Sequence, residues 1–308
     1  MPLRSTILYL ARHKQLRRWV ETSRAARKFS SRFVAGHTLE DGLSVCRKLK
    51  AEGITATLDY LGENVTSLDE AAACRDMYLR MLTAMHETGV EPNVSLKLTQ
   101  FGLDLSEPAC EENVAELVKK AASMGGFVRM DMEGSAYTDR TLALVTRLHQ
   151  GVIGGGDPCG TVLQAYLRRS ERDVQCLERE KIRVRLCKGA YLEPPAVAFP
   201  AKSEVDANYL ALAKSLLANG TYPAIATHDW RMIKAVEKFA AQRGIARDRF
   251  EFQMLYGIRR DEQRRLVSEG YRLRLYVPFG EAWYPYFMRR LAERPANLLF
   301  FARYMLES

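Results

Sequence analysis

Short apolar runs recur about every thirty residues along most of the chain, and segments with a helical pattern lie between them. The eight runs cover residues 56–61, 93–98, 127–132, 161–166, 183–188, 224–228, 250–255 and 272–277. The helical segments begin near Leu68, Cys110, Arg140, Ser170, Asp206, Trp230, Asp261 and Trp283. Each helical segment is long enough to cross back over a sheet. Eight strands alternating with eight returning helices predict an α/β fold, a closed (βα)8 barrel of the TIM type.

An open, doubly wound sheet is the main alternative for this alternation. It is disfavoured because no GxGxxG motif follows any run, and the glycines at 154–156 precede a run, where we expect a turn. No linker rich in Pro, Ser or Gly divides the chain. We therefore predict one barrel domain over residues 36–308. Two short extra helices over residues 1–35 are expected to pack on the barrel or flank it. Thr38 and Asp41 have the spacing of a capping box, which predicts the start of the next helix.

Positive charge is concentrated at the N-terminus. The 308 residues have a net charge of +9, and residues 1–30 contain eight Lys or Arg against the single acidic residue Glu21. The rest of the chain is close to neutral, which argues against a nucleic-acid groove. The basic segment is open to three interpretations: a solvated helix face, a surface that touches anionic lipid, or a mitochondrial-type transit sequence.

The composition, with 47% hydrophobic and 27% charged residues, is that of a folded globular protein. No apolar run approaches the roughly eighteen residues that span a bilayer, and the N-terminus lacks the features of a secretory signal. The six cysteines include no CxxC pair, so we expect buried free thiols in a reducing, cytoplasmic compartment. The five histidines are spread out and form no HExxH motif, which predicts no metal site.

Chemistry in such a barrel collects at the carboxyl ends of the strands. The polar residues in or just after the eight runs are Asp59, Lys97, Asp131, Glu133, Gln164, Arg185, Lys188, Thr227, His228, Asp229, Gln253 and Tyr276. Ionisable residues are costly in a barrel interior unless they are paired or functional. We expect Lys97, Asp131 and Arg185 to form a buried ion network at the mouth. For each residue taken alone, a structural salt bridge or a helix cap is the competing interpretation.

Two adjacent arginines, Arg289 and Arg290, lie in the helical segment after the eighth run. Tyr286 and Glu293 fall on the same side of that helix, at offsets of three and four. Two guanidinium groups can hold one small carboxylate over the seam between them, with Glu293 orienting both. A solvated arginine pair is the alternative, and the spacing alone favours it.

Seven sequence blocks, one for each run from the second to the eighth, have distinctive amino-acid sequences. They are VSLKLTQFGLDLS from Val94, FVRMDME from Phe127, VLQAYL from Val162, VRLCKGAYLEP from Val184, ATHD from Ala226, FEFQMLYG from Phe250 and YVPFGEAWYPYFMRRLAERPAN from Tyr276. These blocks resemble those of the FAD-dependent proline dehydrogenases, in their bacterial monofunctional form. The resemblance covers nearly the whole chain from about Phe33. Its implied fold, a distorted (βα)8 barrel, agrees with the count of runs.

The resemblance implies a role for individual residues. Asp131 and Arg185 would be the catalytic pair near substrate and flavin. The substrate-binding residues would be Lys97, Tyr191, Leu255, Tyr276, Tyr286, Arg289 and Arg290, with Glu293 supporting the two arginines. The residues that touch FAD would be Met132, Gln164, Arg185, Lys188, Gly189, Ala190, Thr227 and His228.

The reaction implied by the resemblance is oxidation of L-proline to Δ1-pyrroline-5-carboxylate, the first step of proline catabolism to glutamate, by hydride transfer from C5 to FAD N5. Electrons would pass to a membrane quinone. The basic segment at residues 1–30 would be the docking surface, which predicts a cytoplasmic protein peripheral on the inner face of the membrane. We expect no aldehyde dehydrogenase domain, so a separate pyrroline-5-carboxylate dehydrogenase would act downstream.

Two other functions are compatible with parts of the sequence. Lys97 or Lys188 at a strand end could form a Schiff base, as in barrel lyases. A basic adaptor for membrane or nucleic acid is a further class, which would bind with steep salt dependence and carry no chromophore. Neither function explains seven ordered blocks.

Overall fold

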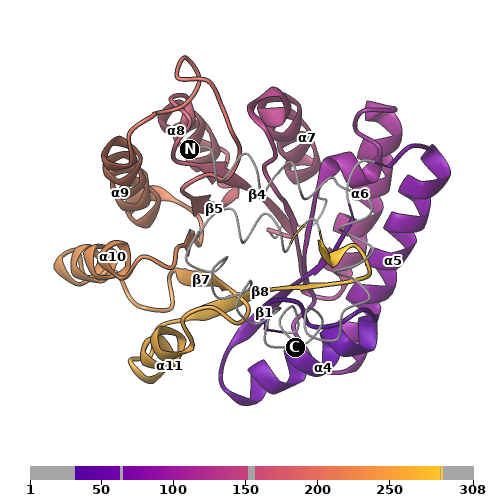
Figure 1. Cartoon of the computed structure of the whole chain (residues 1–308), viewed down its shortest axis with the longest axis horizontal. Coiled ribbons are helices and arrows are strands. Elements are labelled where there is room, and N and C mark those ends of the chain that lie inside the picture. Colours follow the sequence, from indigo (N-terminus) through magenta and orange to yellow (C-terminus); the bar gives the residue numbers. More distant parts are fainter. Residues whose placement is uncertain (1–31, 63–64, 152–156, 285, 287–308) are drawn as a thin grey trace, which may run out of the picture.

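The computed structural model describes residues 32–62, 65–151, 157–284 and 286. Eight parallel strands close into a barrel in sequential order, with β8 paired to β1, and helices surround it (Figure 1). The strands are β1 (Thr55–Tyr60), β2 (Asn93–Leu96), β3 (Phe127–Met130), β4 (Cys159–Gln164), β5 (Arg183–Cys187), β6 (Ala224–Ala226), β7 (Glu251–Leu255) and β8 (Leu273–Phe279). The predicted TIM-type barrel is confirmed.

The helices cover the outside of the barrel. They are α4 (Leu39–Ala51), α5 (Leu68–Glu87), α6 (Glu107–Ser123), α7 (Thr138–Gln150), α8 (Ser170–Arg179), α9 (Lys202–Asn219), α10 (Trp230–Gln242) and α11 (Arg260–Ser268), with short 3-10 turns η1 (Leu98–Phe101) and η2 (Ser135–Tyr137). The predicted capping box of α4 is present, since Thr38 N donates to Asp41 Oδ2 at 2.9 Å and Asp41 N donates to Thr38 Oγ1 at 3.2 Å. α6 starts earlier than the predicted Cys110, and a cap sets its start, since Ser106 Oγ accepts from Ala109 N.

Six of the eight strands end one or two residues before the predicted run does. The second run, 93–98, stops being a strand after Leu96 because the chain turns into η1 at Leu98. β8 instead continues beyond the predicted run 272–277, through Pro278 to Phe279. Pairing with β1 continues there, with Asp59 opposite Pro278 and Tyr60 opposite Phe279. The residues lost at the carboxyl ends of the runs, such as Lys97, Asp131 and His228, follow the strands at the mouth of the barrel.

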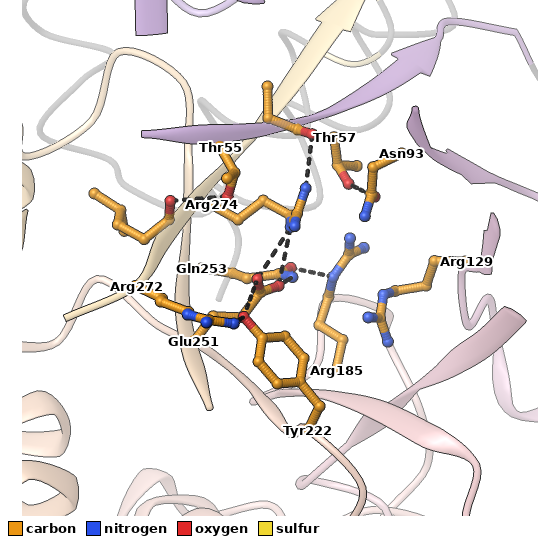
Figure 2. A network of polar contacts seen from close by, with 12 residues as sticks. Thr55, Thr57, Asn93, Arg129, Arg185, Tyr222, Glu251, Gln253, Arg272 and Arg274 are labelled. Carbon is orange, nitrogen blue, oxygen red and sulfur yellow. Dashed lines mark hydrogen bonds and ion pairs between the residues drawn. The ribbon is translucent and has the colours of Figure 1, made fainter. Parts of the chain in front are cut away.

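Two different cores lie on the two sides of the sheet. The side facing the helices is apolar, with Leu58, Val94 and Phe252 among its fully buried residues. The barrel interior is polar, as Figure 2 shows for Glu251 and Arg274, which are 2% and 5% exposed. Successive residues of a strand point to opposite faces, so one strand contributes to both cores. A polar interior below the mouth was not expected from the sequence.

The predicted N-terminal helices lie almost wholly outside the described residues, as does the glycine turn at 154–156. Among the described helices, none combines the length and apolar character needed to cross a membrane.

Candidate active site

Arg185 is the centre of the polar side chains at the carboxyl ends of the strands. It projects from β5, is 6% exposed, and its Nη1 donates to Asp131 Oδ1 at 2.8 Å. Its Nη2 donates to Ser95 Oγ at 2.9 Å, and its Nε donates to Gln253 Oε1. Acceptors from β2, from β7 and from the residue after β3 thus converge on one planar guanidinium group. This convergence fixes the orientation of the cation.

Tyr276, on β8, holds the second oxygen of Asp131. Its hydroxyl donates to Asp131 Oδ2 at 2.9 Å, and its ring centroid lies 5.3 Å from the Arg185 guanidinium carbon. Burial, together with the carboxylates of Asp131 and Asp59, holds the pKa of Tyr276 well above its usual value. The phenol is therefore a neutral hydrogen-bond donor at physiological pH, and both oxygens of Asp131 are engaged.

Lys97 forms an ion pair with Asp59. The Lys97 Nζ lies 3.8 Å from Oδ1 of Asp59, whose side chain is fully buried. Tyr78, from α5, places its hydroxyl 3.4 Å from the same oxygen. The expected network of Lys97, Asp131 and Arg185 is thus organised as two ion pairs, because Asp59 supplies a carboxylate that the prediction left out.

A second group of predicted residues lies at the ends of β4 and β5. Gln164 Nε2 donates to the Glu133 carbonyl at 2.9 Å, and Gln164 Oε1 accepts from Ala190 N at 3.3 Å. Gly189 has φ of +120°, and a Cβ added there would lie 2.1 Å from the Tyr166 ring. Only glycine fits this position, where the loop after β5 passes close to the Tyr166 ring.

Lys188 carries positive charge in the same loop. Its Nζ pairs with Asp206 and, at 3.2 Å, with Asp229. A hydrogen bond from Arg231 and, despite partial burial, one from Lys188 hold the pKa of Asp229 well below its usual value. Thr227 Oγ1 accepts from Asp229 N at 3.1 Å. The loops after β5 and β6 are therefore linked by charge.

His228 and Leu255 connect the ends of β6 and β7. Leu255 N donates to His228 Nε2 at 2.9 Å, so the proton of the neutral imidazole is on Nδ1. Met132 and Tyr286 are buried at 6% exposure each, and Tyr191 is partly exposed. Arg289, Arg290 and Glu293 lie outside the described residues, so the arginine clamp stays a prediction.

The sequence assigned no supporting role to three residues of the site, although Gln253 was among the polar residues at the strand ends. Ser95 and Gln253 accept from Arg185, and Glu193 accepts from Ser135 N and Oγ at 2.6 Å each. The alternation of side chains between the two faces of a strand carries a signal for Ser95 and Gln253. Ser95 precedes Lys97 by two positions and Gln253 precedes Leu255 by two, so each pair shares a face. No comparable signal marks Glu193, which acts from a loop.

All six cysteines are free thiols, and Cys46, Cys110 and Cys159 are buried. Burial raises the pKa of each of these three thiols to about 12, so they stay protonated at neutral pH. Over the described part of the chain, no group of three or more His, Cys, Asp or Glu is placed to hold a metal ion.

The fold and the site together define a TIM-barrel enzyme with a buried arginine–carboxylate pair at the carboxyl ends of its strands. The proline dehydrogenase family model matches residues 43–303. The proline dehydrogenase of Deinococcus radiodurans is 42% identical over 283 residues, 90% of each chain. Proline dehydrogenase 1 of Bacillus subtilis is 39% identical over 305 residues, 99% of each chain.

A solved structure of proline utilization A from Bdellovibrio bacteriovorus superposes with a TM-score of 0.82 at 29% identity. The match covers 87% of this chain and 33% of that one, so this chain spans about a third of its length. The chain belongs to the proline dehydrogenase family. It is an oxidoreductase that carries out the first step of proline catabolism.

Proposed function

We propose that this enzyme oxidises L-proline to Δ1-pyrroline-5-carboxylate, with bound FAD accepting the C5 hydride at flavin N5. The observation that carries the proposal is the arrangement of Arg185, Asp131 and Tyr276. A fixed cation, a fixed carboxylate and a neutral phenol meet at the mouth of the barrel. Such a site can hold a small zwitterionic substrate against a planar cofactor.

The residues after β4, β5 and β6 fit a flavin dinucleotide. Lys188, which Asp206 and Asp229 hold in place, carries positive charge at this edge, and Gly189 leaves its backbone open to close approach. Gln164 and Thr227 offer polar groups, and Ala190, His228 and Met132 complete the set that the family resemblance implies. With this assignment the positive charge of Arg185 adjusts the reduction potential of the flavin.

Hydride transfer makes three demands on the protein: a neutral substrate amine, a proline ring held flat at reacting distance, and exclusion of water. Tyr276, Tyr286 and Leu255 supply the apolar cover, and Tyr191 closes the remaining side. The clamp residues Arg289 and Arg290 fix the register of the substrate carboxylate. Lys97 is its further partner, and Glu293 supports the clamp.

The visible spectrum of the purified protein tests cofactor and substrate together. We expect an oxidised flavin band that L-proline bleaches under anaerobic conditions, with FAD released on denaturation. A colourless protein that borohydride traps with substrate would instead indicate Schiff-base chemistry at a lysine.

Replacing either clamp arginine with methionine should raise KM for proline by at least about tenfold. Each charge-assisted hydrogen bond to a buried carboxylate contributes about 1.5 to 3 kcal/mol, and about 1.4 kcal/mol is a factor of ten. Steady-state kinetics of Arg289→Met and Arg290→Met measure the effect. An unchanged KM in either variant would remove that arginine from the clamp.

Tyr276 should make the enzyme prefer proline over hydroxyproline. Its buried ring is held by the hydrogen bond to Asp131, so it cannot retreat from a substituent on C4 of the substrate. We expect a clearly higher kcat/KM for proline, and a smaller ratio in Tyr276→Ser, where space opens at C4. Equal kcat/KM values for the two substrates in the wild-type enzyme would contradict this role.

The electrons are expected to leave to a membrane quinone, with residues 1–30 as the docking surface. The basic character of this segment supports the proposal, since eight of its residues are Lys or Arg. Removal of residues 1–30 should weaken binding to anionic liposomes. If liposome binding were unaltered, the segment would have no docking role.

A further inference from the structure

Below the catalytic pair, a chain of hydrogen bonds runs through the barrel interior to Arg185 (Figure 2). Arg274 Nε lies 3.1 Å from each oxygen of Glu251. Gln253 Nε2 donates to Glu251 Oε1, and Gln253 Oε1 accepts from Arg185 Nε. All four side chains are at most 6% exposed. The chain therefore connects β8 and β7 to the guanidinium group at the mouth without passing through solvent.

Within this chain of hydrogen bonds, Gln253 lies between a group that only accepts, Glu251, and a group that only donates, Arg185. Burial opposes ionisation of Glu251, but the Arg274 charge outweighs it and the pKa of Glu251 is lowered, so its carboxylate only accepts. The Arg185 guanidinium only donates. A glutamine amide has both functions, so its NH2 must face Glu251 and its oxygen must face Arg185. An apolar side chain of equal length satisfies neither neighbour.

We infer that Gln253 is a positioning residue for proline oxidation, which holds Arg185 by its Nε and thereby sets the direction of the guanidinium at the cofactor site. This inference rests on the proposed function, in which Arg185 faces the flavin. Without Gln253, Asp131 and Ser95 still accept from the two terminal nitrogens, but the Nε end is no longer anchored. The cation then points less well at the reacting centre, while the substrate carboxylate keeps its own partners.

The test compares Gln253→Met with Thr57→Val in the holoenzyme. Thr57 Oγ1 donates to Asn93 Oδ1 inside the same barrel, and Figure 2 shows this pair joined by its own hydrogen bond. Thr57 is 1% exposed and Gln253 4%, so both variants remove a buried hydrogen bond. Of these two variants, only Gln253→Met removes a hydrogen bond to Arg185. Gln253→Asn, which is polar but too short to span both neighbours, serves as a second variant if Gln253→Met does not fold.

We expect Gln253→Met to lower kcat for proline at least about tenfold, because it removes a hydrogen bond to a charged group, while KM changes less than about twofold. The midpoint potential of the bound flavin should fall by about 30 mV, the tenfold factor converted for a two-electron couple. Thr57→Val should keep the wild-type potential and kcat. Gln253→Asn should shift both quantities in the same direction as Gln253→Met.

Three outcomes would overturn the inference. The first is a wild-type kcat and potential in the Gln253 variants. The second is an equal loss of kcat in Gln253→Met and Thr57→Val at an unchanged potential, which would indicate general damage to the barrel. The third is a wild-type protein that proline does not bleach, and only this outcome would remove the proposed function as well.

Discussion

Replacing Arg185 with methionine is expected to lower kcat/KM for proline by at least about a hundredfold. Arg185 donates to Asp131, Ser95 and Gln253, so its loss removes this donor from the partly buried Asp131 and from two buried acceptors. Breaking a buried ion pair by removing one partner costs about 3 to 5 kcal/mol. Part of that cost falls on folding, and the rest on the orientation of Asp131 and on the charge at the cofactor.

Arg183 provides a matched control on the same strand. It lies two residues before Arg185, is partly exposed, and pairs with Asp157 at 3.5 Å near the other end of the barrel. Arg183→Met should change kcat/KM less than about threefold, because pairs of this exposure contribute little. Arg185→Lys should fall between the two, since lysine keeps the charge but not the planar fork. Comparable kinetics for Arg183→Met and Arg185→Met would contradict a special role of Arg185. Thermal unfolding of each variant separates lost stability from lost catalysis.

Replacing Gly189 with alanine is expected to weaken FAD binding by at least about tenfold and to lower Tm. The added Cβ would lie 2.1 Å from the ring of Tyr166, which is 8% exposed and packs against Leu167 and Ala198. The backbone φ of +120° adds strain of about 1 to 3 kcal/mol for a residue with a side chain. The loop after β5 must therefore move, and Lys188, Ala190 and the Gln164 contact move with it.

Gly244 provides a control that separates the effect of backbone strain from that of the steric clash at Gly189. It also has a positive φ, +64°, but no atom lies within 4 Å of the added Cβ. Gly244→Ala should lower Tm slightly and leave the FAD dissociation constant unchanged. Fluorescence titration of apoprotein with FAD measures both variants. If Gly189→Ala bound FAD as tightly as Gly244→Ala does, the loop after β5 would not shape the cofactor site.

Much of the fold could be predicted because it depends on local patterns. The alternation of apolar runs with helical segments identified every strand of the barrel, and the starts of α5, α8 and α10 at Leu68, Ser170 and Trp230 were correct. Strand ends were less accurate. The run over 93–98 continues past Lys97 to the apolar Leu98, whereas the backbone there already turns into η1.

Partner choice within the site could not be predicted. Asp131 was expected in a network with both Lys97 and Arg185, yet Lys97 pairs with Asp59, and Tyr276 holds the second oxygen of Asp131. The interior charges Arg129 and Arg274 were not identified at all. Arg129 is buried at 3% exposure, and burial together with the Arg185 charge lowers its pKa. A sequence does not say which face of a buried strand points into the barrel when both faces are buried.

By itself, the sequence determined the class of fold and the set of polar residues at the strand ends, because periodicity and strand order are written along the chain. Only the tertiary structure decided how those residues pair. Closure of the barrel brings Tyr276 to Asp131 across 145 positions, and Arg185 to Ser95 across 90. Such contacts depend on the register between strands and on which side chain lies closest to each charged group. The physical reason is that a buried charge must find a partner in space, and distance along the chain does not report distance in the barrel.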